Sequence, residues 1–435
     1  MKIAIIGAGW AGMAAAVEAR QAGHETVVFE ASRNLGGRAR SVNARLPNGT
    51  GIALDNGQHI LIGAYVETLR LMRLVGIDPQ TALLRLPMTL LFPDGQGLRF
   101  PPWPTPLDAL GGILSARGWR VRDKWSLLRV ASSWQRSRFQ CDSRLSVAQL
   151  CQRLTPRVMS ELIEPLCVSA LNTPAERASA QVFLRVMGDA LFGVQGGSAL
   201  LLPRLDLSNL FPTAAARWIS EHGGQMRMGL RVESVESIGS AWKVHGEAFD
   251  SVILATAASD AIRLMKVMAQ VATATVCQDI LKWTRITQGL EFEAITTVYA
   301  WAPEATLTHT MVTLRSHPGD ESTPPAPAQF VFDRGQLGGP RGLLAFVVSA
   351  SNGDRETLQE QVLRQAKAQL GLKLQAIQTI VEKRATFACT PGLVRPQQRI
   401  APGLIACGDY VQGPYPATLE GAIRSGQSTL TALGH

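Results

Sequence analysis

The stretch KIAIIGAGWAG, residues 2–12, decides the fold of this chain of 435 residues. Its first half is apolar and predicts a buried strand. Its second half is a complete G-x-G-x-x-G, and the alanine-rich residues 13–20 predict a helix directly after it. A strand, a glycine-rich turn and a helix in this order form the phosphate-binding start of a dinucleotide-binding fold. The residues expected to contact the dinucleotide here are Gly7, Gly9, Trp10, Ala11 and Gly12.

The glycines suit a pyrophosphate for separate physical reasons. Gly7 lets the chain turn sharply, Gly9 has no Cβ to keep a ligand away, and Gly12 lets helix and strand pack closely. The helix N-terminus offers free N–H groups and a partial positive charge. Glu30, followed by Ala31, ends a second apolar run about twenty residues downstream, where its carboxylate can accept hydrogen bonds from ribose hydroxyls. Dinucleotide binding is therefore favoured over a purely structural glycine-rich turn.

A second glycine pair indicates which dinucleotide is bound. Gly36 and Gly37 let the backbone approach a ligand, and the guanidinium of Arg38 suits a further set of phosphate oxygens. The segment resembles the flavin amine oxidoreductase and phytoene desaturase superfamily, in which this second diphosphate contact is diagnostic. The resemblance implies FAD as the cofactor. A solvated glycine turn with a surface arginine is the alternative.

The length of the chain predicts two domains. The resemblance implies an α/β (α+β) fold, in which a Rossmann-type, GR2-like FAD-binding domain carries an inserted substrate domain of mixed sheet and helices. We assign residues 1–64, 203–265 and 395–435 to the FAD-binding domain. The substrate-binding domain takes residues 65–202 and 266–394, with a helical insertion at about 113–140.

Composition and charge limit the classes of partner that this protein is expected to bind. The net charge of +9 and the pI near 9.6 favour an anionic partner, and without a recognised nucleic-acid-binding module a membrane surface is the better candidate. The six cysteines form no C-x-x-C pair, which favours reduced thiols in the cytosol. The histidines show no metal-ligand spacing, so no metal is assigned. Since no uncharged apolar run reaches the length of a membrane span, we expect a cytoplasmic protein, peripheral at the inner face of the membrane.

The insertion at about 113–140 interleaves cations with tryptophans. Such a composition is typical of helices that lie on an anionic membrane. An ordinary helix pair with a solvated basic face is the other interpretation, and both stay open. The residues concerned are Arg117, Trp119, Arg120, Arg122, Lys124, Trp125, Arg129, Trp134, Arg136 and Arg138.

A more specific resemblance begins at Asp55-Asn-Gly-Gln-His59. Together with residues 164–174 and 413–421, this segment resembles the hydroxysqualene dehydroxylase family over nearly the whole chain. The resemblance places Gly57, Gln58 and His59 beside the flavin ring, although a buried structural histidine is an equal alternative for His59. Apolar residues of the helical insertion, Leu162, Leu166 and Leu171, either line a substrate tunnel or belong to the core.

The third FAD element lies near the C-terminus, where Gly408-Asp409 follows a predicted strand and precedes a glycine- and alanine-containing helix. By resemblance, Asp409 binds the ribityl chain and the helix N-terminus faces the flavin pyrimidine. An aromatic residue common in amine oxidases is replaced by Thr418, which argues against an amine substrate. The further cofactor-binding residues expected are Val232, at the adenine, and Gly408, Asp409, Thr418, Leu419 and Ala422.

The activity implied by the resemblance is reductive dehydroxylation of hydroxysqualene to squalene. The site must then protonate a poor leaving group and shelter an allylic cation. The candidate acids are His59 and Tyr415, with Asp55 and Glu420 behind them. His59 ranks first, because an imidazolium can donate a proton near neutral pH. For Glu420, capping or orienting the last helix is favoured over an acid role. Expected partners are an isoprenoid substrate and neighbouring enzymes of squalene and hopanoid synthesis, not nucleic acid. The alternatives are a phytoene-desaturase-like oxidation of a polyisoprenoid and a non-catalytic prenyl-lipid-binding protein.

Overall fold

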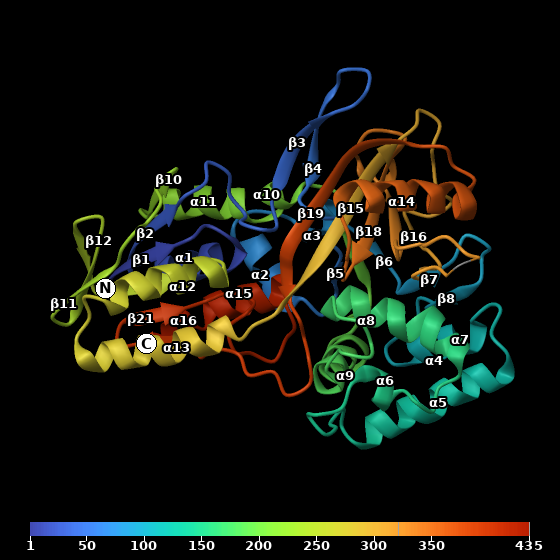
Figure 1. The fold of residues 1–435 in the computed structure, drawn as a ribbon, viewed down its shortest axis with the longest axis horizontal. Helices are drawn as coiled ribbons and strands as arrows, with labels where there is room; N and C mark the ends of the chain where they lie inside the picture. Colours follow the sequence, from blue (N-terminus) through green and yellow to red (C-terminus); the bar gives the residue numbers. More distant parts are fainter. Residues whose placement is uncertain (321, 435) are drawn as a thin grey trace.

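The computed structural model describes residues 1–320 and 322–434. Figure 1 shows two parts side by side: a sheet covered by helices, which contains both chain ends, and a part that combines a second sheet with a group of helices. Long segments of chain pass between the two parts more than once. The α/β (α+β) expectation is confirmed.

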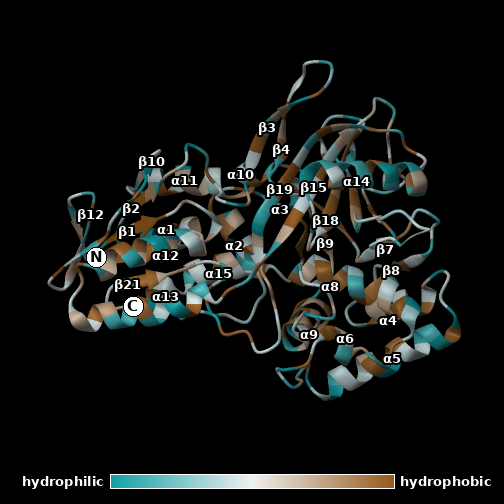
Figure 2. Ribbon diagram, viewed as in Figure 1, coloured by the Kyte–Doolittle hydropathy of each residue, from teal (hydrophilic) through white to brown (hydrophobic). Residues whose placement is uncertain are grey.

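A six-stranded sheet forms the centre of the first part, and its strand order is β10-β2-β1-β14-β21-β20. All neighbouring strands are parallel except the last pair, β20 and β21. The inner strands β1, β2 and β14 are buried and read as continuous apolar runs, which Figure 2 shows in brown for β1 and β2, whereas β10 at the edge is polar and partly exposed. The strands are β1 (Lys2–Ile6), β2 (Glu25–Glu30), β10 (Gln225–Met228), β14 (Ser251–Leu254), β20 (Arg399–Ala401) and β21 (Leu404–Ala406).

Helices cover this sheet, and the first of them packs most closely. Helix α1 (Trp10–Gln21) contacts α11 (Pro212–Glu221) and α15 (Leu419–Gln427). Gly426 permits this approach, because a Cβ there would collide with the backbone of Ala11. Helices α1 and α15, far apart in the sequence, are thus in direct contact. The other helices here are α2 (Val66–Leu74), α3 (Pro79–Ala82), α10 (Leu207–Leu210), α12 (Ala258–Ala269), α13 (Ala274–Gln288) and α16 (Thr429–Leu433).

A five-stranded antiparallel sheet, in the order β16-β17-β18-β15-β19, forms the second part. Its side chains alternate between two faces: Val331 packs beneath α14 (Arg355–Leu370), while Phe330 and Phe332 face the opposite way. The strands are β15 (Phe292–Trp301), β16 (Met311–Thr313), β17 (Phe330–Asp333), β18 (Leu343–Ser349) and β19 (Gln375–Phe387). A 3₁₀ turn, η3 (Gly335–Leu337), links β17 to β18.

A group of helices, which includes residues 113–136 of the expected insertion, lies beside this sheet. Two π-helical turns, η1 (Met159–Ile163) and η2 (Asp189–Gly193), interrupt it. The α-helices are α4 (Leu107–Ser115), α5 (Val121–Arg136), α6 (Val147–Leu150), α7 (Pro156–Val158), α8 (Glu164–Leu171) and α9 (Ala180–Gly188). Within the described parts of the chain, no helix combines the length and apolarity needed to cross a bilayer.

Short strands complete the fold. Strands β7 (Thr89–Leu91) and β8 (Gly97–Arg99) form an antiparallel hairpin. Residues 231–235 are irregular, because the chain leaves the edge of the main sheet before it enters a separate three-stranded sheet. The remaining strands are β3 (Ser41–Arg45), β4 (Gly51–Asp55), β5 (Leu61–Ile62), β6 (Leu83–Leu86), β9 (Leu200–Pro203), β11 (Glu236–Ile238), β12 (Ala241–Val244) and β13 (Glu247–Phe249).

Candidate functional site

One cavity of about 930 Å³ joins the two parts of the molecule. It runs from the turn between β1 and α1, past Arg38 to Asp409, and then opens into an apolar chamber. Every cofactor-binding residue predicted from the sequence lines this cavity except Gly12. Gly12 instead packs against the carbonyl of Gly7 and the side chain of Ala255, which is the helix-packing role expected of it. We refer to the end between the glycines and Asp409 as the slot, and to the apolar end as the chamber.

The slot has the shape that a diphosphate needs. Gly9 and Gly36 lie side by side in a β-bridge, and a Cβ on Gly37 would stand 3.2 Å from the Cα of Gly9. No side chain within the described residues caps the N-terminus of α1, so its first N–H groups are left for a ligand. Side chains at these glycines would fill the slot. Because the glycines leave it open beside free backbone N–H groups, the residues present fit the phosphates of FAD.

Glu30 and Arg38 are already held by protein partners. The Glu30 carboxylate accepts hydrogen bonds from the backbone N–H groups of Ala8 (2.7 Å) and Ser32 (2.8 Å). Arg38 pairs with Asp409 at 2.5 Å and donates to the carbonyl of Ala385 at 2.6 Å. The second and third FAD elements are thus joined directly across the slot, although 371 positions separate them in the sequence.

Asp55 does not reach the cavity. Its Oδ1 accepts the N–H of Leu207 at 2.8 Å, and its backbone carbonyl accepts the Tyr299 hydroxyl at 3.0 Å. Its Oδ2 finds no hydrogen bond among the described residues and lies 3.8 Å from the guanidinium of Arg334. Burial raises the pKa of Asp55 to about 6, against the opposing effect of Arg334. Asp55 supports the turn behind the site and does not face a substrate.

His59 and Gln58 line the cavity at the end of this turn. The Nδ1 of His59 lies 2.8 Å from the carbonyl of Gly57, so Nδ1 carries the proton and Nε2 is an acceptor. Burial lowers the pKa of His59, the bond to Gly57 opposes this, and Arg38 lowers it further. Arg334 holds Gln58 by donating to its Oε1 at 3.1 Å. His59 is therefore a neutral imidazole near neutral pH and not an imidazolium, which corrects its expected rank as the first candidate acid.

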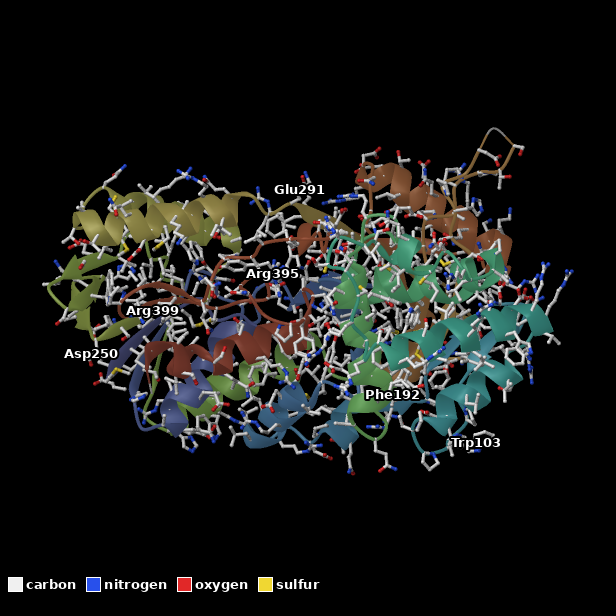
Figure 3. All side chains as sticks on the ribbon, turned by 90° about the horizontal axis from the view of Figure 1, so that it is seen from below. Trp103, Phe192, Asp250, Glu291, Arg395 and Arg399 are labelled. Atoms are coloured by element: carbon white, nitrogen blue, oxygen red, sulfur yellow. The ribbon has the colours of Figure 1, made fainter. Side chains whose placement is uncertain are left out.

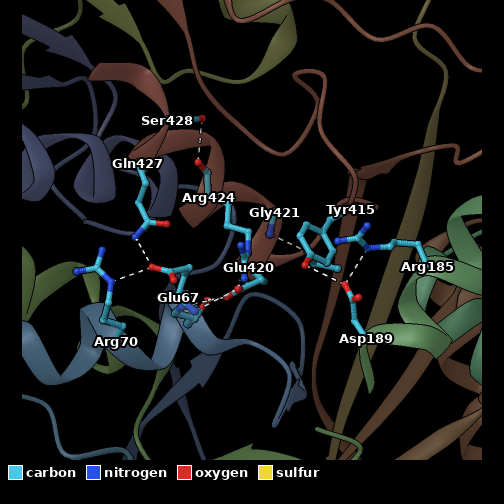
Figure 4. A network of polar contacts seen from close by, with 12 residues as sticks. Glu67, Arg70, Arg185, Asp189, Tyr415, Glu420, Gly421, Arg424, Gln427 and Ser428 are labelled. Carbon is cyan, nitrogen blue, oxygen red and sulfur yellow. Dashed lines mark hydrogen bonds and ion pairs between the residues drawn. The ribbon is translucent and has the colours of Figure 1, made fainter. Parts of the chain in front are cut away.

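Tyr415 lines the same cavity with a partner that sequence reasoning missed (Figure 4). Its hydroxyl donates to Oδ2 of Asp189 at 2.9 Å, and the same oxygen accepts Nε of Arg185 at 3.0 Å. The guanidinium groups of Arg185 and Arg424 lie 5.7 and 5.2 Å from the Tyr415 ring centroid. Burial first, and Asp189 next, raise the pKa of Tyr415. Asp189 stands in no motif, and only the fold brings it to Tyr415 across 226 positions.

Glu420 has a structural role at the start of α15. Its fully buried carboxylate accepts the hydroxyl of Thr68 (2.7 Å) and the N–H of Thr68 (2.9 Å), and it pairs with Arg424 at 2.7 Å. Thr418 caps the helix by accepting the N–H of Gly421 at 3.0 Å. Glu420 thus ties α15 to α2, as Figure 4 shows.

The chamber is apolar and is walled by both the second sheet and the helices. Leu162 and Leu166 line the chamber, as the tunnel interpretation expects. Leu171 is instead buried in the core. An elongated hydrocarbon fits such walls. Representative wall residues are Phe100, Leu127, Trp134, Leu166, Phe330 and Phe332.

Known proteins resemble the chain along its whole length. It is 26% identical to the hydroxysqualene dehydroxylase of Zymomonas mobilis, covering 99% of both chains. It is also 26% identical to the hydroxysqualene dehydroxylase of Sinorhizobium fredii, covering 97% of this chain and 95% of the relative. Zeta-carotene desaturase of Solanum lycopersicum is 32% identical over only 28% of the chain.

Solved structures share the fold at low sequence identity. An oxidoreductase from Methanosarcina mazei superposes with a TM-score of 0.72 at 16% identity, covering 99% of this chain and all of the other. Reduced UDP-galactopyranose mutase superposes with a TM-score of 0.66 at 14% identity, covering 100% of this chain and 94% of the other. The family described as flavin containing amine oxidoreductase matches residues 10–429. The chain belongs to this family, and it is an FAD-dependent oxidoreductase.

Proposed function

We propose that this protein removes the allylic hydroxyl of hydroxysqualene to give squalene, as a step of hopanoid synthesis. The observation that carries the proposal is the continuity of the slot with a long apolar chamber, because a flavin and a polyisoprenoid can then meet in one enclosed space. Relatives named hydroxysqualene dehydroxylase, which match at 25–26% identity over at least 97% of this chain, support it.

The reaction exchanges one bond for another. The C–O bond of the alcohol breaks, a C–H bond forms from a hydride, and a proton leaves with the hydroxyl group as water. Reduced FAD, when bound, supplies the hydride. The chain itself must hold the polyene, exclude bulk water and deliver one proton to the leaving oxygen.

We assign the proton delivery to Tyr415. Its raised pKa keeps the phenol protonated at neutral pH, and Tyr415 is among the residues that line the cavity. The guanidinium groups of Arg185 and Arg424 beside the ring favour the phenolate that forms when the proton leaves. In the structure this proton is donated to Asp189, so delivery requires the Tyr415 hydroxyl to turn from Asp189 to the leaving oxygen. Neutral His59, with Nε2 as an acceptor, positions the substrate hydroxyl or a water molecule.

Two other functions compete with this one. A phytoene-desaturase-like oxidation would use the same cofactor, but the carotene desaturase relatives match only a limited segment of the chain. A non-catalytic prenyl-lipid-binding protein would use the chamber alone. The residues fitted to a diphosphate at the slot argue against that second alternative.

We infer that the protein acts in the cytoplasm, peripheral at the inner face of the membrane. The net charge of +9 favours an anionic surface, and the six cysteines are all unpaired. Its expected partners are the hydrophobic substrate and the enzymes that produce hydroxysqualene and consume squalene.

The test is an anaerobic single-turnover experiment with FAD-loaded protein. Reduced protein mixed with hydroxysqualene should return to the absorbance of oxidised flavin and should yield squalene in equal amount. Squalene in place of hydroxysqualene should leave the flavin reduced, because it lacks the leaving group. Bleaching of oxidised flavin by phytoene, without reaction of hydroxysqualene, would instead establish a desaturase, and protein that never retains flavin would leave only lipid binding.

A further inference from the structure

Exposed apolar side chains gather where the chamber opens to the surface. Leu107 and Leu110 on α4 and Phe192 on η2 all line the cavity. They are nevertheless 54, 41 and 41% exposed to solvent. A side chain that lines a cavity and is exposed at the same time marks its mouth. The mouth of the chamber therefore lies between α4 and η2.

The apolar surface extends outward from this mouth. Leu107, Leu110 and Leu114 follow the i, i+3, i+7 spacing that places them on one face of α4. The ring of Trp103 packs over Gly111 on the same helix, where a Cβ would meet the ring at 2.5 Å. Figure 3 shows Trp103 and Phe192 toward the lower edge of the helical region. Contiguous exposed apolar side chains of this kind mark an interaction surface.

The structure divides the tryptophans of the insertion into two groups. Trp119 is buried and donates its indole N–H to Glu161 at 2.9 Å. Trp134 is also buried and packs edge-on against Phe183. Trp125 is 68% exposed. Trp119, in the loop between α4 and α5, and Trp134, on the inner face of α5, thus belong to the core, and only Trp125 of the three is available to a surface partner.

The outer face of α5 combines apolar and cationic groups. At about 100° per residue, the exposed residues of this face fall within an arc of about 100° around the helix. This arc lies opposite the buried Leu127 and Val130. Lys124 joins the two helices by donating to the backbone carbonyl of Leu114 at 2.5 Å. The exposed residues of this face are Val121, Arg122, Trp125, Arg129 and Arg136.

We propose that α4, Trp103 and the outer face of α5 dock onto an anionic lipid bilayer with the chamber mouth against the hydrocarbon. The apolar side chains enter the acyl boundary while the arginines meet the headgroup phosphates. This inference rests on the proposed function in one respect: a polyisoprenoid alcohol could then pass from the bilayer into the chamber without crossing water. A second copy of the chain is a poorer occupant, because it would oppose one arginine-rich helix with another.

Vesicle co-sedimentation of the full-length, FAD-loaded protein tests the docking surface. We expect binding to phosphatidylcholine vesicles that contain phosphatidylglycerol, weak binding to phosphatidylcholine alone, and loss of binding as salt increases. Leu114→Ser should weaken binding about tenfold. The matched control is Leu281→Ser on α13, since Leu281 and Leu114 are 52 and 55% exposed.

The charged groups are tested separately. The double variant Arg129→Gln with Arg136→Gln should weaken binding about fivefold for each arginine removed. Its control, Arg355→Gln with Arg364→Gln, removes two exposed arginines from α14 and should leave binding unchanged. Equal losses in test and control variants would overturn the proposal, and so would equal binding to neutral and anionic vesicles. So would a lipid-free dimer that Leu114→Ser dissociates, because the surface would then be occupied by a second copy.

The vesicle-binding test of the docking surface does not depend on whether the proposed reaction takes place. Vesicle binding requires no reaction, whereas flavin reoxidation by hydroxysqualene can be followed in detergent solution. Leu114 and Arg129 lie outside the cavity lining, so their variants should react normally in detergent. Failure to bind vesicles with normal reaction in detergent rejects the docking surface alone. Normal vesicle binding without reaction in detergent rejects the proposed function alone.

Discussion

The slot and the chamber are two ends of one cavity, and they are built in opposite ways. Glycines and backbone groups from a few short segments form the slot, where Gly9 and Gly36 are directly bridged. Side chains from two sheets and several helices form the chamber, and no single segment supplies its wall. Space in the slot depends on missing side chains, while space in the chamber depends on the sizes of many. A single substitution in the slot should therefore abolish FAD binding, whereas a single substitution in the chamber should change substrate affinity only moderately.

The largest effect is expected at Gly9. A Cβ there meets only ordinary contacts, 3.8 Å from Gly37 and 3.9 Å from the Gly36 carbonyl, so Gly9→Val should fold. Its side chain enters the slot and should weaken FAD binding by on the order of 100-fold or more. Purified Gly9→Val should be colourless, and titration with FAD followed by flavin fluorescence measures the loss.

Gly51→Ala is the control for this variant, because a Cβ at Gly51 meets no described atom within 4 Å. It should bind FAD as the unaltered protein does. Retention of FAD by Gly9→Val with unchanged affinity would contradict the assignment of the slot to the diphosphate.

The next effect is expected where slot and chamber meet. Tyr415→Phe removes the hydroxyl proposed to protonate the leaving group, and the reaction rate should fall by about 100-fold or more with FAD still bound. Stopped-flow absorbance of the flavin measures this rate. Tyr410→Phe is a matched control, since the buried Tyr410 hydroxyl finds no partner within the described chain and lies outside the cavity lining. A similar fall in both variants would point to altered packing and not to proton delivery.

A graded effect is expected in the chamber. Leu166→Trp adds bulk to a wall residue, and we expect about a tenfold rise in KM for hydroxysqualene, from a packing cost of one to two kcal/mol. FAD affinity should not change, because Leu166 lies in the apolar wall. Steady-state kinetics across isoprenoid alcohols of decreasing length measure the effect, which should diminish for the shorter ones. Loss of FAD together with substrate affinity would show that slot and chamber are not separable.

The smallest effect on turnover is expected behind the site. The folded-state pKa of Asp55, about 6, lies above its ordinary 3.8, so its protonated form contributes stability below pH 4 and loses it as pH rises through 6. The shift corresponds to roughly 3 kcal/mol. Asp55→Asn stays neutral, so relative to the unaltered protein its free energy of unfolding should rise between pH 4 and pH 8. Urea denaturation at both pH values measures this, and parallel pH profiles would refute it.

The contrast between slot and chamber also explains what the sequence could predict. Gly9, Gly37 and Asp409 were found because a phosphate contact requires a particular residue type at a particular spacing. All three line the cavity. Asp189 was missed because its role depends on Tyr415, which comes from a distant segment, and no local pattern encodes that meeting. The family resemblance supplied the flavin chemistry, but it did not reveal which polar groups face the chamber.

Charge and burial explain two other differences between the sequence-based expectations and the structure: the protonation of His59 and the positions of the tryptophans. A histidine reads as a proton donor from its ordinary pKa, but burial and the neighbouring Arg38 keep His59 neutral. The tryptophans of the insertion read as one group in composition. Helical periodicity assigns Trp134 to the same buried face as Leu127 and Val130, while Trp125 faces outward. Attention to the helix face, and not to composition, would have separated them.

The ion pair between Arg38 and Asp409 has a consequence for biosynthesis of the protein. Asp409 is translated 371 residues after Arg38, and strand β21, which completes the parallel order beside β14, comes shortly before Asp409. The nascent chain therefore cannot close its cofactor site until this whole interval has been translated. Loading with FAD should wait for that step, and messages truncated shortly before codon 404 should yield apoprotein whatever the supply of flavin.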